Sequence, residues 1–81
     1  MHYVYVLQSE IDRNLYIGHT DDLKRRFKEH NNGQVPSTEK MTPLRLVYYE
    51  DCNVLEDAIK REKHFKTGFG RAYLKRRLSD I

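Results

Sequence analysis

The chain has 81 residues, of which 38% are hydrophobic and 33% are charged, and its formal net charge at pH 7 is +3. This composition is typical of a soluble globular protein rather than of a disordered chain, and the length suits one domain, over residues 1–81, without accessory modules. No apolar run approaches the roughly 20 residues that a membrane-spanning helix needs, and residues 1–6 lack the pattern of a secretory signal. We therefore expect no membrane partner.

The single cysteine, Cys52, cannot form a disulfide within the chain, which favours a cytoplasmic location. It follows Glu50 and Asp51, and no cation stands beside it in the sequence. Because a reactive thiolate needs a positive environment, we do not expect Cys52 to be a catalytic thiol.

The positive charge is concentrated towards the C-terminus. Residues 53–81 carry eight Lys/Arg and four Asp/Glu, whereas residues 1–52 carry seven and eight. This distribution fits a surface for a polyanion such as nucleic acid. A basic helix face that is simply solvated would have the same composition, and charge alone does not separate the two interpretations.

The N-terminal segment predicts a β-hairpin. Residues 3–7 are rich in aromatic and β-branched residues, residues 10–14 form a polar turn, and residues 15–19 indicate a second strand. In an antiparallel pair Tyr5 and Tyr16 could lie close together on one face. The alternative is that both are ordinary packing residues, as most strand tyrosines are.

A helix is predicted directly after the hairpin. Thr20 is expected to be its N-cap, with two acidic residues, 21 and 22, in the first turn, where the helix dipole favours negative charge. The residues that recur at helical spacing are Leu23, Phe27 and His30. Residues 31–33, Asn-Asn-Gly, are typical of a helix end because they tolerate left-handed geometry.

The remaining chain predicts a loop, a third strand and two more helices. The loop covers residues 33–43 and the strand residues 44–49; Asn53 is expected to cap the second helix, with Glu56 completing a capping box. Two glycines, at positions 68 and 70, are expected to break the chain before a short basic helix over residues 71–78. The predicted fold is α+β: a small three-stranded antiparallel sheet with helices packed on it, in the order β-β-α-β-α-α.

The second predicted helix carries a carboxylate within its apolar stripe. The stripe consists of Leu55, Ala58, Ile59, Glu62 and Phe65. Carboxylates are rarely buried unless they are paired or bound to a metal, so Glu62 is a candidate to project into a cleft beside the sheet. The alternative, which helical geometry alone favours, is a glutamate at the edge of the stripe or paired with Arg or Lys.

Arg26 and His30 share a face of the first predicted helix because they are four residues apart. Arg26 borders the apolar stripe, where its planar guanidinium could bind a phosphate. A surface salt bridge with Asp22 is the alternative for Arg26. For His30 the alternative is a partly buried histidine near the helix end, where the dipole favours its cation.

These separated segments resemble the GIY-YIG nuclease superfamily. Residues 3–5, Tyr-Val-Tyr, resemble its first signature segment with glycine and isoleucine replaced, and residues 16–18, Tyr-Ile-Gly, match the second. The G-x-T-x-x-L-x-x-R-x-x-x-H run of the family is matched from Gly18 to His30, and residues 58–66 resemble its A-x-x-x-E-x-x-x-K helix. The resemblance extends over nearly the whole chain and is closest to small stand-alone members.

The resemblance implies a metal-dependent endonuclease that hydrolyses phosphodiester bonds in nucleic acid, with DNA the expected substrate. It implies that Tyr5 and Tyr16 are paired active-site tyrosines, and that Arg26 is catalytic with His30 beside it. Glu62 would be the sole protein ligand of Mg²⁺ or Mn²⁺. The basic residues that we expect to contact nucleic acid are Lys40, Lys66, Arg71 and Lys75.

Two departures from the family pattern stand out. Tyr3 replaces the usual glycine and could narrow the approach to the site, and no asparagine follows Asn53, although some family members have one after the metal-binding helix. Two further alternatives remain: a non-catalytic nucleic-acid-binding module on the same scaffold, or a nuclease that needs a protein partner for targeting. The loop over residues 34–43 is either a phosphate-contacting element or a plain surface loop.

Overall fold

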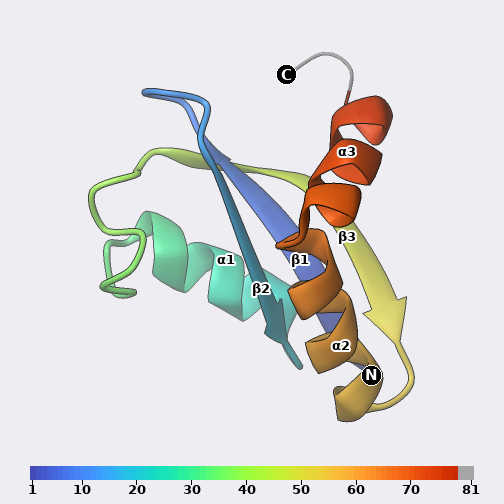
Figure 1. Cartoon of the computed structure of the whole chain (residues 1–81). Helices are drawn as coiled ribbons and strands as arrows, with labels where there is room; N and C mark the ends of the chain where they lie inside the picture. Colours follow the sequence, from blue (N-terminus) through green and yellow to red (C-terminus); the bar gives the residue numbers. More distant parts are fainter. Residues whose placement is uncertain (79–81) are drawn as a thin grey trace.

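The computed structural model describes residues 1–78, and in this part of the chain three strands and three helices follow one another in the order β-β-α-β-α-α. They are β1 (His2–Ser9), β2 (Leu15–Thr20), α1 (Leu23–Asn31), β3 (Leu44–Cys52), α2 (Leu55–Phe65) and α3 (Gly68–Arg77). The strands form one antiparallel sheet in the order β2-β1-β3, with α1 on one side and α2 and α3 on the other (Figure 1). The α+β fold and the order of elements predicted from the sequence are confirmed. None of the helices in residues 1–78 has the length and apolar character to cross a membrane.

The register of the hairpin places the two tyrosines of the signature segments on one face of the sheet. Tyr5 lies opposite Gly18, and Leu7 lies opposite Tyr16. Because residues that alternate along a strand share a face, Tyr5 and Tyr16 are diagonal neighbours on the α1 side.

A bulge in β3 distributes its side chains between the two faces. Val6 of β1 pairs with Tyr48, whereas Leu7 pairs with Leu46, so that Val47 is an extra residue in the ladder. Val47 and Tyr48 consequently both pack on the side of α2 and α3, while Leu46 packs on the side of α1.

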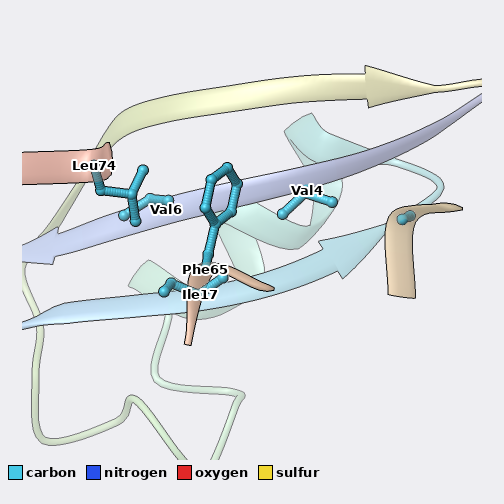
Figure 2. Packing of buried hydrophobic residues seen from close by; sticks show 6 residues of the cluster. Val4, Val6, Ile17, Phe65 and Leu74 are labelled. Atoms are coloured by element: carbon cyan, nitrogen blue, oxygen red, sulfur yellow. The ribbon is translucent and has the colours of Figure 1, made fainter. Parts of the chain in front are cut away.

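The sheet is covered by an apolar cluster on each face. On the side of α2 and α3, buried strand residues pack against the two helices, as Figure 2 shows; this cluster contains Val4, Val6, Ile17, Ala58, Phe65 and Leu74. On the other side the buried residues are Tyr5, Leu7 and Leu44, packed against Leu23 and Phe27 of α1. The alternation along β1 therefore places Tyr5 in a core that α1 closes.

Two helix starts differ from the sequence prediction. The N-cap of α1 is Asp22, whose Oδ1 accepts from the backbone N–H of Arg25 at 3.1 Å, and not Thr20. Thr20 is still paired with Tyr3 in the sheet, so the helix cannot begin there. The N-cap of α2 is Val54 and not Asn53, and it makes no side-chain bond. Two acidic residues in the first turn, Glu56 and Asp57, interact favourably with the dipole of α2 instead.

The final helix begins earlier than predicted. Helix α3 starts at Gly68, and Thr67 caps it by accepting from the N–H of Gly70 at 3.1 Å. A Cβ on Gly70 would lie 2.0 Å from the carbonyl oxygen of His64. Gly70 is therefore required for close packing of α3 against the end of α2, and it does not break the helix.

Candidate active site

Tyr5 and His30 form the buried centre of the site, with Tyr16 beside them. The Tyr5 hydroxyl lies 2.8 Å from Nε2 of His30, and both residues are fully buried or nearly so. The ring centre of Tyr16 lies 5.1 Å from that of His30 and 6.5 Å from that of Tyr5. Helix α1 supplies the histidine because its apolar side packs on the face of the sheet that carries the two tyrosines. The structure thus brings three of the residues nominated from the sequence together.

The second ring nitrogen of His30 is also engaged. Its Nδ1 lies 2.7 Å from Oγ1 of Thr38, a fully buried residue of the loop between α1 and β3. Burial lowers the pKa of His30, and the positive charge of Arg26 lowers it further, against a weaker opposing effect of Glu29. We therefore expect a neutral imidazole at neutral pH.

Arg26 lies one turn before His30 on α1, and Nη1 of its guanidinium lies 3.2 Å from Oε1 of Glu29. The influence of the Tyr5 hydroxyl raises the pKa of Arg26. The salt bridge with Asp22 that the sequence left open does not form, because the Asp22 side chain caps the helix. Burial raises the pKa of Tyr5 to about 12, although Arg26 acts in the opposite direction. Tyr5 is consequently a neutral phenol at neutral pH.

Glu62 approaches from α2, on the opposite side of the sheet. Its Oε1 lies 2.6 Å from Nδ1 of His19, and its Oε2 accepts from the ammonium of Lys66 at 2.9 Å. Burial alone would raise the pKa of Glu62, but the hydrogen bonds and charges of Lys66 and His19 outweigh burial and lower it. The side chain is 19% exposed, so Glu62 is an ionised, accessible carboxylate at the edge of its apolar stripe.

A cleft at the outer edge of β2 connects the two sides of the sheet. It has a volume of about 360 Å³ and is lined by His2, His19, Thr20, Asp21, Arg25, Arg26 and Leu55. It therefore extends from Arg26 on α1 to His19, the imidazole of which contacts Glu62. The negative charge of Glu62 is also the smallest of the effects that raise the pKa of Tyr5.

A larger groove of about 520 Å³ lies on the other side of α1, next to β3. Tyr3 lines this groove, and its ring packs edge-on against Tyr49 at a centroid distance of 6.2 Å. The residue that replaces the usual glycine thus lines a different groove from the cleft beside Arg26. The smaller cleft is the candidate site, because its lining includes Arg26 and His19, and His19 contacts Glu62.

The four basic residues nominated for nucleic-acid contacts occupy different surfaces. Lys66 is part of the site because it binds Glu62. Arg71 and Lys75 line a hollow of about 400 Å³ along α3, together with Leu15 of β2. Lys40 is exposed on the loop that follows α1.

Sequence reasoning did not identify two partners of the site, His19 and Thr38. It considered Thr38, with Ser37 and Lys40, only as part of a loop that either contacts phosphate or lies on the surface, whereas Thr38 is buried against His30. His19 had a usable signal: it alternates with Ile17 along β2, so both side chains point towards α2. Thr38 had none, because its contact with His30 depends on how an irregular loop folds back on α1.

The residues at the cleft fit a hydrated divalent cation better than a closed metal site. Among residues 1–78 no group of three or more His, Cys, Asp or Glu side chains could hold a metal ion. Glu62 is nevertheless an ionised carboxylate with partial access to solvent. Mg²⁺ commonly binds through one or two carboxylates, retains several waters and takes its remaining ligands from substrate phosphates. Glu62 could therefore hold such an ion together with a bound phosphodiester.

The domain combines a tyrosine-bearing hairpin, a helix that carries arginine and histidine, and a second helix that carries one carboxylate. This combination is that of a compact α+β domain of a nuclease class. The chain belongs to the GIY-YIG family, since the model of the GIY-YIG catalytic domain matches residues 1–78. The resemblance inferred from the sequence motifs is thereby confirmed.

Several relatives carry the name UPF0213 protein. The relative from Staphylococcus saprophyticus is 39% identical over 67 residues, which cover 82% of this chain and 80% of the relative. The relative from Haloquadratum walsbyi is also 39% identical, over 82% of this chain and 74% of its own length. The relative from Clostridium perfringens is 40% identical, over 82% of this chain and 71% of its own length. No solved structure matches the chain.

Proposed function

We propose that this chain is an endonuclease that hydrolyses phosphodiester bonds in DNA with the help of Mg²⁺ or Mn²⁺. The observation that carries the proposal is a cleft lined by an accessible arginine, Arg26, and by His19, which contacts the ionised carboxylate of Glu62. The buried pair of Tyr5 and the neutral His30 lies one helix turn from that arginine. These are the groups that hydrolysis of a phosphodiester needs, namely a proton acceptor, a cation for the phosphate and an anchor for a metal.

Tyr5 is the proposed acceptor of the proton from the attacking water. Because burial raises its pKa to about 12, Tyr5 does not act as a free phenolate at neutral pH. Nε2 of His30, 2.8 Å from the hydroxyl, takes the tyrosine proton as the proton of the water arrives. The water oxygen then bonds to phosphorus, and the bond from phosphorus to the ester oxygen breaks. The leaving oxygen keeps the bonding electrons and takes a proton from solvent, and the proton held by His30 returns to solvent. Tyr16, next to both residues, would orient the water.

Arg26 would stabilise the negative charge that builds up on the phosphoryl oxygens. Its side chain is 37% exposed and lines the cleft, so a phosphate can replace Glu29 as its partner. A guanidinium can donate two parallel hydrogen bonds to phosphate oxygens, which binds the group and fixes its orientation.

Glu62 would hold the divalent ion. When bound, the ion would neutralise charge on the phosphate and on the leaving oxygen. In the absence of the ion, Lys66 and His19 keep the carboxylate ionised and hold it beside His19, which lines the cleft. Loss of either hydrogen bond would leave Glu62 available for a cation.

The basic C-terminal segment is the proposed contact for the nucleic-acid backbone. Lys66 at the cleft, Arg71 and Lys75 on α3, and Lys40 on the loop would bind phosphates. Phosphate contacts position the substrate without reading its sequence. Selection of a particular DNA site would then require a targeting partner protein.

A cleavage assay with matched controls tests the proposal. Labelled duplex, single-stranded and branched DNA, and RNA, are incubated with Mg²⁺ or Mn²⁺ at low salt, since phosphate contacts weaken with salt. We expect metal-dependent cutting of DNA that is lost in Glu62→Ala and Arg26→Ala. Glu56→Ala on α2 and Lys28→Ala on α1 remove exposed charged residues from the same helices, away from the lining of the cleft, and should retain cutting.

A non-catalytic binding module is the second candidate, and one observation favours it. Both carboxylate oxygens of Glu62 already have partners in His19 and Lys66, so a metal is not needed to explain its position. Nucleic acid that is bound but not cut, with an affinity that Glu62→Ala leaves unchanged, would establish this alternative.

A further inference from the structure

We infer that Thr38 is a positioning residue: its buried hydroxyl holds His30 in the tautomer with hydrogen on Nδ1, so that Nε2 is free to accept the proton of Tyr5. The consequence for catalysis rests on the proposed function. The tautomer itself is a property of the folded protein that can be measured without any substrate. The hydrogen bonds at the two ends of the Thr38–His30–Tyr5 chain fix the tautomer.

At the Thr38 end, the hydroxyl has two neighbours. Its Oγ1 lies 2.7 Å from Nδ1 of His30, and it donates to the carbonyl oxygen of Val35 at 3.4 Å. A hydroxyl has one hydrogen and two lone pairs. Because the carbonyl can only accept, the hydroxyl hydrogen is directed to Val35, and a lone pair faces the ring. Nδ1 must then carry the hydrogen of the neutral imidazole.

At the Tyr5 end, the hydrogen-bond partner of the phenol within residues 1–78 is Nε2 of His30. The guanidinium of Arg26 lowers the pKa of Tyr5, but it can only donate and so offers the tyrosine hydrogen no acceptor. If Nε2 of His30 donated to the phenol oxygen, the tyrosine hydrogen would have no acceptor in a residue that is 2% exposed. An unsatisfied buried donor is costly, and within residues 1–78 no buried side-chain N or O atom is left unpartnered. Tyr5 therefore donates to Nε2, and the two ends require the same tautomer.

The tautomer matters because a neutral imidazole has one basic nitrogen. With hydrogen on Nδ1, the lone pair of Nε2 lies 2.8 Å from the tyrosine hydroxyl and can accept its proton. With hydrogen on Nε2, the basic nitrogen would face Thr38, which is away from the reacting groups. Thr38 would thus direct the basic nitrogen of His30 towards Tyr5 without touching substrate itself.

The loop backbone holds Thr38 firmly at this position. The N–H of Thr38 donates to the carbonyl of Val35 at 3.0 Å, and its own carbonyl accepts from Met41 at 2.8 Å. Both Val35 and Thr38 are buried. The loop between α1 and β3 therefore contributes to the site through its interior side, in addition to presenting Lys40 outside.

Long-range ¹⁵N–¹H NMR spectra of the intact chain test the inference, since they identify which ring nitrogen of a histidine carries hydrogen. We expect hydrogen on Nδ1 of His30 in the wild type and in Thr38→Ser, which keeps the hydroxyl. In Thr38→Val a measurable fraction of the hydrogen should move to Nε2, because Nδ1 loses its acceptor while the Tyr5 hydroxyl continues to favour hydrogen on Nδ1. Thr42→Val removes an exposed hydrogen bond from the Thr42 hydroxyl to the backbone carbonyl of Glu39 in the same loop, and it should leave the tautomer unchanged.

Kinetics supply the second readout. We expect Thr38→Val to lower kcat by roughly 10- to 100-fold with KM unchanged, and Thr38→Ser to restore most of the rate. Hydrogen on Nε2 in the wild type would overturn the inference even if Thr38→Val does not fold. An unchanged tautomer in a folded Thr38→Val protein would overturn it as well. If the wild type binds nucleic acid without cutting it, the proposed function fails, while the spectra still decide the tautomer.

Discussion

The backbone of Gly18 lies directly against the ring of Tyr5. A Cβ at position 18 would lie 2.6 Å from the Tyr5 hydroxyl oxygen and 3.2 Å from a ring carbon of Tyr16. Gly18 is paired with Tyr5 in the hairpin, so any side chain at position 18 would occupy the space that the two tyrosines share. The glycine of the second signature segment thus allows the tyrosine hydroxyl to reach His30.

Gly18→Ala should displace the Tyr5 hydroxyl and separate it from Nε2 of His30. We expect the free energy of unfolding to fall by about 1–3 kcal/mol, as at other overpacked sites. The rate of cleavage should fall about 100-fold. Denaturant unfolding and single-turnover cleavage would measure the two effects. Tyr5→Phe removes the atom that the new methyl group would meet first, so the stability losses of the two substitutions should be less than additive. Additive losses would contradict the contact.

Gly70 provides a second test of close approach, in the packing of α3 on α2. A Cβ there would lie 2.0 Å from a backbone oxygen of His64, which a side-chain rotation cannot relieve. Gly70→Ala should therefore destabilise the fold by about 3 kcal/mol or more, measured by thermal or urea unfolding. Gly68→Ala is the matched control in the same helix, because no atom lies within 4 Å of its Cβ. Because alanine has a higher helix propensity than glycine, Gly68→Ala should be neutral or slightly stabilising. A loss of similar size at both positions would contradict the packing explanation.

The buried His30 predicts a loss of stability in mild acid. Its pKa in the folded chain lies below the usual 6.5, because burial and the charge of Arg26 disfavour the imidazolium. The unfolded chain then binds more protons than the folded one as the pH falls from about 6.5 towards the folded pKa, so the free energy of unfolding declines in that window. It declines by at most about 1.4 kcal/mol per pH unit for one group. Above pH 7 the contribution of His30 is complete.

Urea unfolding between pH 5 and 8 measures this dependence. His30→Gln removes the titrating group and should flatten the profile, whereas His64→Gln on the exposed side of α2 should leave it unchanged. The rate of cutting should fall over the same window, because protonated His30 cannot accept the proton of Tyr5. An identical pH profile in His30→Gln would contradict the assignment.

The basic residues of α3 predict a salt-dependent affinity for duplex DNA. Each phosphate contact contributes about 0.9 to the slope of log affinity against log salt concentration. Arg71→Gln and Lys75→Gln should each reduce the slope by about that amount, in fluorescence anisotropy titrations at several salt concentrations. Lys28→Gln removes an exposed charge from α1 and serves as the control. Equal changes for all three variants would indicate a diffuse charge effect and not a contact surface on α3.

Local patterns in the sequence were sufficient for the elements and for most of the site. Alternation placed Tyr5 and Tyr16 on one face of a hairpin, and helical spacing placed Arg26 and His30 on one face of α1. These inferences succeed because a strand repeats every two residues and a helix every 3.6, whatever packs around them. The exact helix starts were predicted less well, because the extent of the neighbouring strands and the packing of α2 against α3 decide where each helix begins.

The tertiary structure alone decided how the groups of the site meet. The contact between His19 and Glu62 joins residues 43 positions apart, and that between Thr38 and His30 depends on an irregular loop. The sequence by itself determined the α+β fold, the family and the chemical type of each nominated side chain. Which partner each polar atom has, and so the tautomer of His30 and the ionised state of Glu62, follows from burial and long-range packing, which no local periodicity encodes.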